Sequence, residues 1–142
     1  MADRVKVLFV CYGNSCRSQM AEGLANELAA DVIEAQSAGV SPLGHIANST
    51  REVLLDRGIS IDGHFSKFLN DSSLTQPDLI VNMSGLQGET LFDGRAFEDW
   101  DVGDPYGDDM ETYRRICDDI EARVRDLAAR LRGERTTQSP RK

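Results

Sequence analysis

The sequence predicts an α/β domain with three layers, in which a parallel β-sheet is flanked by helices. Short apolar segments rich in β-branched residues alternate along the chain with segments whose apolar residues recur at helical spacing. The segment VKVLFV at 5–10 is nearly all apolar, as expected of a strand that is covered on both faces. Alternating strands and helices favour a parallel sheet with helical crossovers. The chain of 142 residues is long enough for one such domain.

The expected elements follow one another in a regular order. Further strands are expected at 32–37, 78–83 and 96–100, which gives a four-stranded sheet. The first strand is followed by a helical pattern made by Met20, Leu24, Ala25 and Leu28. A second helix is expected to be capped by Asn48 or Ser49, to carry Val53 and Leu54, and to end at Gly58. The last helix has one apolar stripe, formed by Met110, Tyr113, Ile116, Cys117, Ile120, Val124, Leu127 and Leu131.

Charge is distributed unevenly along the chain. Five basic residues and one acidic residue give residues 130–142 a net charge of +4. The whole chain carries −8, so the remaining residues carry −12. An acidic body repels nucleic acid and anionic membrane surfaces, so an anionic substrate must be held by a strong local device. Residues 133–142 contain no apolar side chain and are expected to form a disordered basic tail.

Cysteine usage and the lack of a long apolar segment predict a cytoplasmic protein that does not span a membrane. The chain has three cysteines, which is too few and an odd number for a disulfide framework. No apolar run approaches the ~18 residues that a membrane span needs. The first ten residues, MADRVKVLFV, have too short an apolar stretch for a signal peptide.

The segment CYGNSCRS at 11–18 lies between the first strand and the first helix. Ligands of open α/β sheets bind at this kind of junction, where free backbone N–H groups and the positive end of the helix dipole converge on an anion. The same field stabilises a thiolate at Cys11, and Arg17 supplies a planar fork for an oxyanion. Between these two residues lie the expected binding residues Tyr12, Gly13, Asn14, Ser15 and Cys16.

The loop sequence therefore predicts that Cys11 attacks a bound phosphate-like oxyanion. Gly13 and Asn14 suit such a loop because both tolerate positive φ, which lets successive N–H groups point inward. The alternative is a buried, inert Cys11 at a strand end with Arg17 solvated on the helix.

The segment VLFVCYGNSCRSQMAEG at 7–23 resembles the signature of the low-molecular-weight protein tyrosine phosphatase superfamily, which includes the thioredoxin-coupled arsenate reductases. Four further segments recur in the family's order, namely SAG at 37–39, GISIDGHFSK at 58–67, PDLIV at 77–81 and DP at 104–105. The resemblance thus runs from about residue 5 to residue 131. It implies a four-stranded parallel sheet with flanking helices and a single phosphatase-like catalytic domain over residues 1–132.

The resemblance also implies a role for each matching residue. Cys11 is the nucleophile, Arg17 clamps the equatorial oxygens, and Ser18 hydrogen-bonds the sulfur of Cys11 to ease its departure. Asn14 holds the loop in its unusual conformation. Asp104 is the general acid that protonates the leaving oxygen, and its carboxylate then activates water.

Tyr12 is expected to border the pocket mouth, where it either packs against an aromatic substrate ring or is a partly exposed loop residue.

The sequence carries features of two branches of the family. Gln19, the segment AEG at 21–23 and the segment WDVGDP at 100–105 look like the arsenate reductases, whereas phosphatases usually have proline in place of Gln19 and often have two tyrosines after Asp-Pro. Here Tyr106 is followed by Gly107.

Thioredoxin-coupled reductases resemble this chain but use two further cysteines as a relay. Their approximate positions here hold Ser84 and Leu91, and Cys117 is expected to pack in the core. A reductase would therefore need an external thiol from a small molecule or a glutaredoxin-like partner.

The favoured function is hydrolysis of a phosphomonoester, with a phosphotyrosine protein as substrate, through a cysteinyl-phosphate intermediate. Two alternatives remain open, namely an arsenate reductase that uses Cys11 with an external thiol and a non-catalytic module that binds oxyanions or phosphoproteins. No cofactor or metal is implied, because neither His45 nor His64 has metal-ligand spacing with another candidate. A solvent-facing thiolate at Cys11 is also expected to be oxidised by peroxide and resolved by Cys16 as a disulfide, provided that the loop geometry allows the bond.

Overall fold

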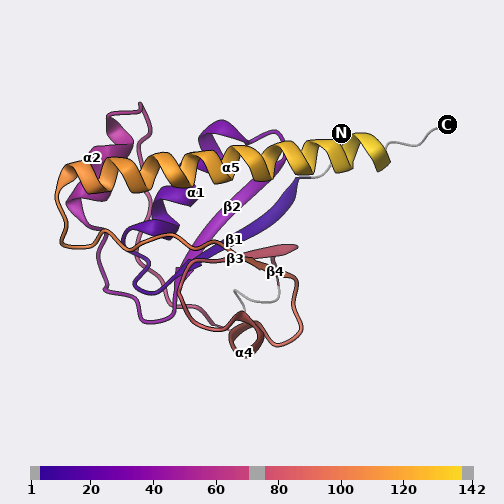
Figure 1. Ribbon diagram of the computed structural model, residues 1–142, viewed down its shortest axis with the longest axis horizontal. Coiled ribbons are helices and arrows are strands. Elements are labelled where there is room, and N and C mark those ends of the chain that lie inside the picture. The colour runs from indigo at the N-terminus through magenta and orange to yellow at the C-terminus, as the bar shows by residue number, and fades with distance from the viewer. Residues whose placement is uncertain (1–3, 71–75, 139–142) are drawn as a thin grey trace.

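The computed structural model describes residues 4–70 and 76–138. Its centre is a four-stranded sheet in the order β2-β1-β3-β4, with every neighbouring pair parallel (Figure 1). The strands are β1 (Val5–Cys11), β2 (Ile33–Gly39), β3 (Leu79–Asn82) and β4 (Phe97–Asp99). The predicted four-stranded parallel sheet is confirmed, and Cys11 ends an inner strand in register with Gly39 of β2.

Helices flank the sheet on both sides, as predicted. The helices are α1 (Arg17–Leu28), α2 (Asn48–Leu55), α4 (Gly88–Phe92) and α5 (Met110–Gln138). Figure 1 shows α1 and α5 together over one face, with α4 beyond the other face. Alternation along β1 explains this arrangement, since Val7 and Phe9 join the core under α1 and α5, whereas Leu8 and Val10 pack with Phe92 of α4.

The apolar stripe predicted for the last helix is confirmed by burial. Five of its members are at most 2% exposed, namely Tyr113, Cys117, Ile120, Val124 and Leu127. The expectation that Cys117 packs in the core is therefore confirmed. Two ion pairs hold the far end of α5 to the body: Arg130 Nη2 lies 3.0 Å from Glu98 Oε2, and Arg132 Nε lies 2.8 Å from Asp31 Oδ2.

The predicted disordered tail is wrong for residues 133–138, because α5 continues to Gln138. A glycine inside a helix costs only about 1 kcal/mol relative to alanine, so Gly133 does not end a helix that already has its hydrogen-bonded turns in place. Residues 139–142 lie outside the described residues.

The structure also corrects the predicted cap of α2. The residue at the N-cap is Ala47, and no side chain caps the helix. Instead the Ala47 N–H donates to Ser15 Oγ at 2.9 Å, so the start of α2 rests on the 11–18 loop. The helix ends at Leu55, three residues before the predicted end, and Gly58 adopts φ +77° in the turn that follows. The short helix α4 was not predicted.

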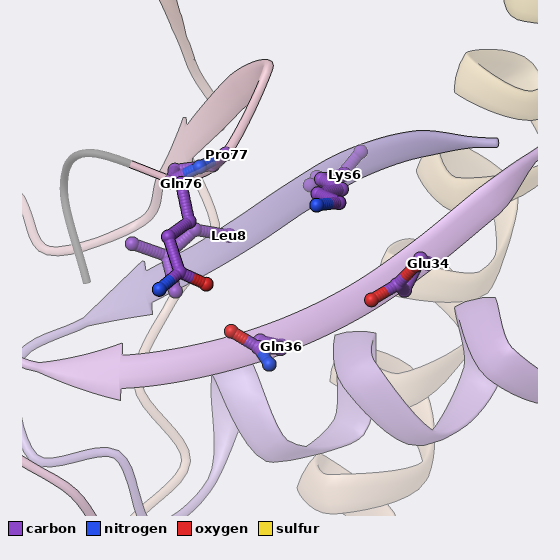
Figure 2. Close-up of a pocket in the computed structure, with 7 residues that line it drawn as sticks. Lys6, Leu8, Glu34, Gln36, Gln76 and Pro77 are labelled. Carbon is purple, nitrogen blue, oxygen red and sulfur yellow. The ribbon is translucent and has the colours of Figure 1, made fainter. Parts of the chain in front are cut away.

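Part of the second sheet face carries polar side chains near the start of the strands. Figure 2 shows Lys6 on β1 beside Glu34 and Gln36 on β2, with Gln76 and Pro77 next to them in a shallow hollow. A strand rises about 3.3 Å per residue, so Lys6 lies roughly 16 Å along β1 from Cys11. None of the described residues that line this hollow is a cysteine, serine or threonine.

No helix within residues 4–70 and 76–138 is both long and apolar enough to cross a membrane.

Candidate active site

The loop after β1 has the conformation that an anion cradle requires. Asn14 has φ +49°, so the left-handed backbone expected at this position is present. Gly13 does not have positive φ, so the expectation that glycine stands at this position because it tolerates positive φ is wrong. A Cβ on Gly13 would lie 3.1 Å from Leu43 Cγ, so a larger residue there would have to displace the Leu43 side chain slightly.

The backbone N–H groups of the loop are left without protein partners. Within the described part of the chain, no amide N–H from Tyr12 to Arg17 donates a hydrogen bond to another residue. The carbonyls are bonded outward: Tyr12 O accepts from Ser41 N at 2.8 Å, and Ser15 O accepts from Thr50 Oγ1 at 2.9 Å. Buried backbone donors normally have partners, so a run of unpaired N–H groups at the start of a helix forms a binding site for an anion.

Cys11 lies at the floor of this cradle and contacts Ser18. The sulfur is 2.9 Å from Ser18 Oγ, and the Ser18 N–H points to it at 3.5 Å. Asn14 Nδ2 donates to Ser18 Oγ at 2.7 Å, so that oxygen acts as an acceptor toward Asn14 and its own proton is free to point at the sulfur. The contact expected between Ser18 and Cys11 is present, and the role of Ser18 in catalysis stays a prediction.

Arg17 is held so that one edge of its guanidinium is available to a ligand. Its side chain is 9% exposed, and Nη1 donates to Met83 O at 2.6 Å and to Val102 O at 3.2 Å. Nε is buried and has no hydrogen-bond partner within residues 4–70 and 76–138. Nε and Nη2 share one edge of the plane and can therefore bind two oxygens of one oxyanion. The alternative of a solvated Arg17 is excluded by this burial.

Asp104 lies in the same pocket as Cys11, although 93 positions separate them in the sequence. Its Oδ2 is 3.6 Å from Arg17 Nη2, and its side chain is 51% exposed. The other oxygen, Oδ1, accepts from the Tyr106 N–H at 3.1 Å, which fixes the carboxylate at the start of a turn. Asp104 thus lines the same pocket as Cys11 and Arg17, and its role as the general acid stays a prediction.

The expected binding residues are distributed on two sides of the loop. Tyr12, Gly13, Ser15 and Cys16 line the pocket, as predicted. Asn14 was predicted to bind substrate but does not line the pocket, because its side chain is fully buried behind the loop.

Three half-exposed apolar side chains surround the opening of the pocket. They are Tyr12, Leu43 and Tyr106, and they come from separate segments. The Tyr106 hydroxyl oxygen lies 3.5 Å from His45 Nε2. Leu43 was missed by sequence reasoning, because a leucine in a Ser-Pro-Leu-Gly turn carries no signal that links it to the loop.

Cys16 lines the pocket but directs its sulfur toward α5. Its Sγ is 3.3 Å from Tyr113 Oη, and burial raises the pKa of the Cys16 thiol. The sequence pattern placed Tyr113 in the core stripe and gave no sign of this second contact.

The family model described as low molecular weight phosphotyrosine protein phosphatase matches residues 6–137. The chain belongs to this family. The chain is similar to the glutaredoxin arsenate reductase from Synechocystis sp. (strain ATCC 27184 / PCC 6803 / Kazusa). The two are 33% identical over 130 residues, which are 89% of this chain and 98% of the relative.

Solved structures of both branches have the same fold. An arsenate reductase in the phosphate binding state superposes with a TM-score of 0.82 and 32% identity, covering 89% of this chain and 98% of its own. The low molecular weight protein tyrosine phosphatase from T. tengcongensis has a TM-score of 0.81 and 31% identity, covering 89% of this chain and 99% of its own. The fold and family are thus shared by phosphatases and arsenate reductases.

The positions expected for relay cysteines in this family hold other side chains. Ser84 follows β3 and donates from Oγ to Asn82 Oδ1 at 2.7 Å, and Leu91 is in α4. Besides Cys11 and Cys16 the sequence has only Cys117, which is buried in the core. Among the residues that the structure describes, no group of three or more His, Cys, Asp or Glu side chains is placed to hold a metal ion. The expectation of a metal-free site stays a prediction.

Proposed function

We propose that this member of the family hydrolyses phosphomonoesters, with phosphotyrosine in a protein as its substrate, through a cysteinyl-phosphate on Cys11. The observation that carries the proposal is the set of unpaired donors around the sulfur: the amide N–H groups from Tyr12 to Arg17 and the buried Nε of Arg17. Together they complement the three non-bridging oxygens of a phosphoryl group.

In the first step the thiolate of Cys11 attacks phosphorus. A sulfur–phosphorus bond forms while the bond from phosphorus to the ester oxygen breaks, and Asp104 gives its proton to the departing oxygen. The guanidinium of Arg17 and the loop N–H groups balance the negative charge of the phosphoryl oxygens during transfer.

In the second step water replaces the sulfur. The carboxylate of Asp104 takes a proton from the water, the new phosphorus–oxygen bond forms, and the sulfur–phosphorus bond breaks. The hydroxyl of Ser18, at 2.9 Å, donates to the departing thiolate of Cys11. Inorganic phosphate leaves and Asp104 is again protonated.

The rim of the pocket supports an aromatic leaving group. Tyr12, Leu43 and Tyr106 offer apolar surface around the opening, against which a phenyl ring can pack while its phosphate reaches Cys11. We also assign the enzyme to the reducing cytoplasm, because its three cysteines are free thiols.

A second candidate is reduction of arsenate, which is supported by the similarity to a protein named glutaredoxin arsenate reductase. Cys11 would displace water from arsenate and form a sulfur–arsenic bond. An external thiol would then attack the Cys11 sulfur, arsenite would leave with the electron pair, and a mixed disulfide would remain. This route requires the external thiol because Ser84 and Leu91 occupy the relay positions.

A side-by-side assay distinguishes these functions. Pre-reduced protein is given phenyl phosphate or arsenate, each with and without glutathione, and the release of phosphate and arsenite is measured. We expect phosphate release that does not depend on glutathione. Arsenite formed only with glutathione, without phosphate release, would establish the reductase. A rise of Tm with inorganic phosphate but no turnover in either assay would leave the non-catalytic binding module.

Arg17→Lys is expected to lower kcat/KM by about 10²–10³-fold, the usual cost of losing a positioned oxyanion donor. A lysine ammonium cannot reproduce the planar fork of the guanidinium. Its single nitrogen also cannot replace the Arg17 Nη1 bond to Met83 O while presenting two donors to the phosphate. Steady-state kinetics on phenyl phosphate measure the loss. Arg51→Lys is the control, because Arg51 donates to Ile61 O and does not line the pocket. Near-normal activity of Arg17→Lys would remove Arg17 from the clamp.

Peroxide is expected to inactivate the enzyme reversibly through a disulfide between Cys11 and Cys16. Peroxide oxidises the thiolate of Cys11 to a sulfenic acid, and attack by Cys16 forms the disulfide and releases water. Cys16 must first turn away from Tyr113, which it contacts in the structure. Recovery of activity with a dithiol is compared among wild type, Cys16→Ser and the control Cys117→Ser. Equal recovery of all three would show that Cys16 does not protect Cys11.

A further inference from the structure

The turn that carries Asp104 is mostly exposed. Among residues 103–109 only Pro105 is buried, and the Asp104 side chain is 51% exposed. Within the turn the Asp108 N–H donates to Pro105 O at 2.8 Å. This bond shapes the turn but does not connect it to the loop that holds Cys11. An exposed segment with few buried contacts opens readily, so the position of Asp104 depends on where the turn is anchored.

The Tyr113 hydroxyl lies between this turn and the oxyanion loop (residues 11–18). Tyr113 is in the first turn of α5 and is 2% exposed. Its Oη is 3.3 Å from Sγ of Cys16, which is 3% exposed and stands at the N-cap of α1. The backbone N–H of Gly107, in the Asp104 turn, also interacts with the Tyr113 hydroxyl, and the two residues line one hollow. One buried oxygen therefore contacts both segments of the site.

The chemistry of a phenol suits both contacts. A hydroxyl has one proton to donate and two lone pairs that accept. It can therefore accept from the Gly107 N–H and donate to the sulfur of Cys16 at the same time. Burial raises the pKa of the Tyr113 hydroxyl, so this group keeps its proton at neutral pH. Because the ring already belongs to the core, replacing Tyr113 by phenylalanine removes the two contacts and leaves the packing in place.

We propose that Tyr113 is a positioning residue, which links the Asp104 turn to the oxyanion loop and so holds the general acid beside the phosphoryl group bound at Cys11. The proposal rests on the proposed function, because that function makes Asp104 the acid. Cys11 is fixed at the end of an inner strand, whereas Asp104 lies in a turn beyond the edge strand, and the link defines their relative position. Tyr113 does not line the pocket of Cys11 and acts through Gly107 and Cys16, without touching the substrate.

Tyr113→Phe is the first test of the link. It is expected to lower kcat/KM for phenyl phosphate by about 10-fold, as a small displacement of a catalytic group does. The loss is expected to be much smaller for an ester of a nitro-substituted phenol, whose departing oxygen needs little help from an acid. The affinity for inorganic phosphate, measured from the rise of Tm with phosphate, is expected to match wild type, because the loop N–H groups and Arg17 stay in place.

A double variant shows whether Tyr113 acts through Asp104. If Tyr113 only positions the acid, adding Tyr113→Phe to Asp104→Asn is expected to cause no further loss of kcat/KM. Ile120→Val is the matched control, because it shortens a fully buried side chain about two turns further along the same stripe of α5, outside the pocket. It is expected to lower Tm and to leave the activity and its dependence on the leaving group unchanged.

Hydrogen exchange tests the link without turnover. The Tyr106 N–H donates to Asp104 Oδ1 at 3.1 Å, so the exchange of this amide reports whether the carboxylate keeps its place. In Tyr113→Phe the Tyr106 and Gly107 amides are expected to exchange about 10-fold faster than in wild type, which corresponds to one hydrogen bond of ordinary strength. In Ile120→Val they are expected to exchange as in wild type, because an exposed turn opens locally.

Three results would overturn the proposal. A Tyr113→Phe variant with the leaving-group dependence and amide exchange of wild type would show that the link has no effect. An equal loss for every ester, or a further loss in the Asp104→Asn background, would make Tyr113 a support of the fold alone. If Tyr113→Phe does not fold, Cys16→Ala decides by the same measurements, because it removes the link from the side of the loop. A wild type that binds phosphate without hydrolysing esters would refute the proposed function, and the amide exchange would still test the link.

Discussion

Cys11→Ser is expected to abolish turnover of phenyl phosphate, lowering kcat by about 10⁴-fold or more, as removal of an enzymatic nucleophile does. A serine hydroxyl is a far weaker nucleophile than a thiolate, and the site places no general base against residue 11, since the contacting Ser18 hydroxyl is a donor to it. The cradle itself is built from backbone N–H groups and Arg17, which the substitution leaves in place. The variant is therefore expected to bind inorganic phosphate nearly as well as wild type.

Two measurements on Cys11→Ser separate chemistry from folding. The first is single-turnover and steady-state release of phosphate, and the second is the rise of Tm with added phosphate. Cys117→Ser is the control, because Cys117 is a buried thiol of the core and its loss leaves the pocket unchanged. A serine variant that kept more than a few percent of wild-type activity would show that Cys11 is not the nucleophile.

The parts of the site that sequence reasoning predicted are those that are local in the chain. A buried strand, a short loop and a helix start are adjacent in sequence, so the apolar run at 5–10 and the residue types at 11–18 determine where Cys11 and Arg17 lie. Hydrophobic periodicity likewise predicted the four strands and the stripe of α5, because burial on a known face is a property of successive residues.

The contacts that were missed depend on how distant segments pair. Asp104 reaches the pocket only because β4 is placed beside β3, at the end of the sheet order. Nothing near Leu43 indicates that it approaches the loop, since its segment is irregular and carries no period. Family resemblance supplied the place of Asp104, but the contact between Tyr113 and Cys16 could be read only from the structure.

The errors at helix ends have local causes. The predicted cap of α2 assumed that a polar side chain satisfies the first N–H groups, whereas Ser15 of the loop supplies that acceptor from a distant position. The five-residue α4 is too short to show a helical period. The extension of α5 beyond Gly133 follows from the ease of propagating a helix compared with starting one.

Asp104→Asn is expected to lower kcat/KM most for esters whose leaving group is basic. General acid catalysis contributes about 10²–10⁴-fold, and it matters most where the departing oxygen would otherwise leave as an unstable alkoxide or phenolate. For phenyl phosphate we expect a loss in that range, and for an ester of an acidic, nitro-substituted phenol a much smaller loss. A plot of log kcat/KM against leaving-group pKa is therefore expected to be steeper for the variant than for wild type.

The asparagine substitution is chosen because it keeps the shape of the turn. Its side-chain oxygen can still accept from the Tyr106 N–H, so the segment stays at the mouth of the pocket. What it loses is the proton for the leaving group and the ion pair with Arg17 at 3.6 Å. These two losses have different signatures, because a change in Arg17 affects every substrate alike, whereas a missing acid affects basic leaving groups selectively. Asp101→Asn, a neutralisation in the same exposed segment outside the pocket, controls for the change in net charge. An equal loss across the leaving-group series would assign Asp104 to holding Arg17 and would require another acid.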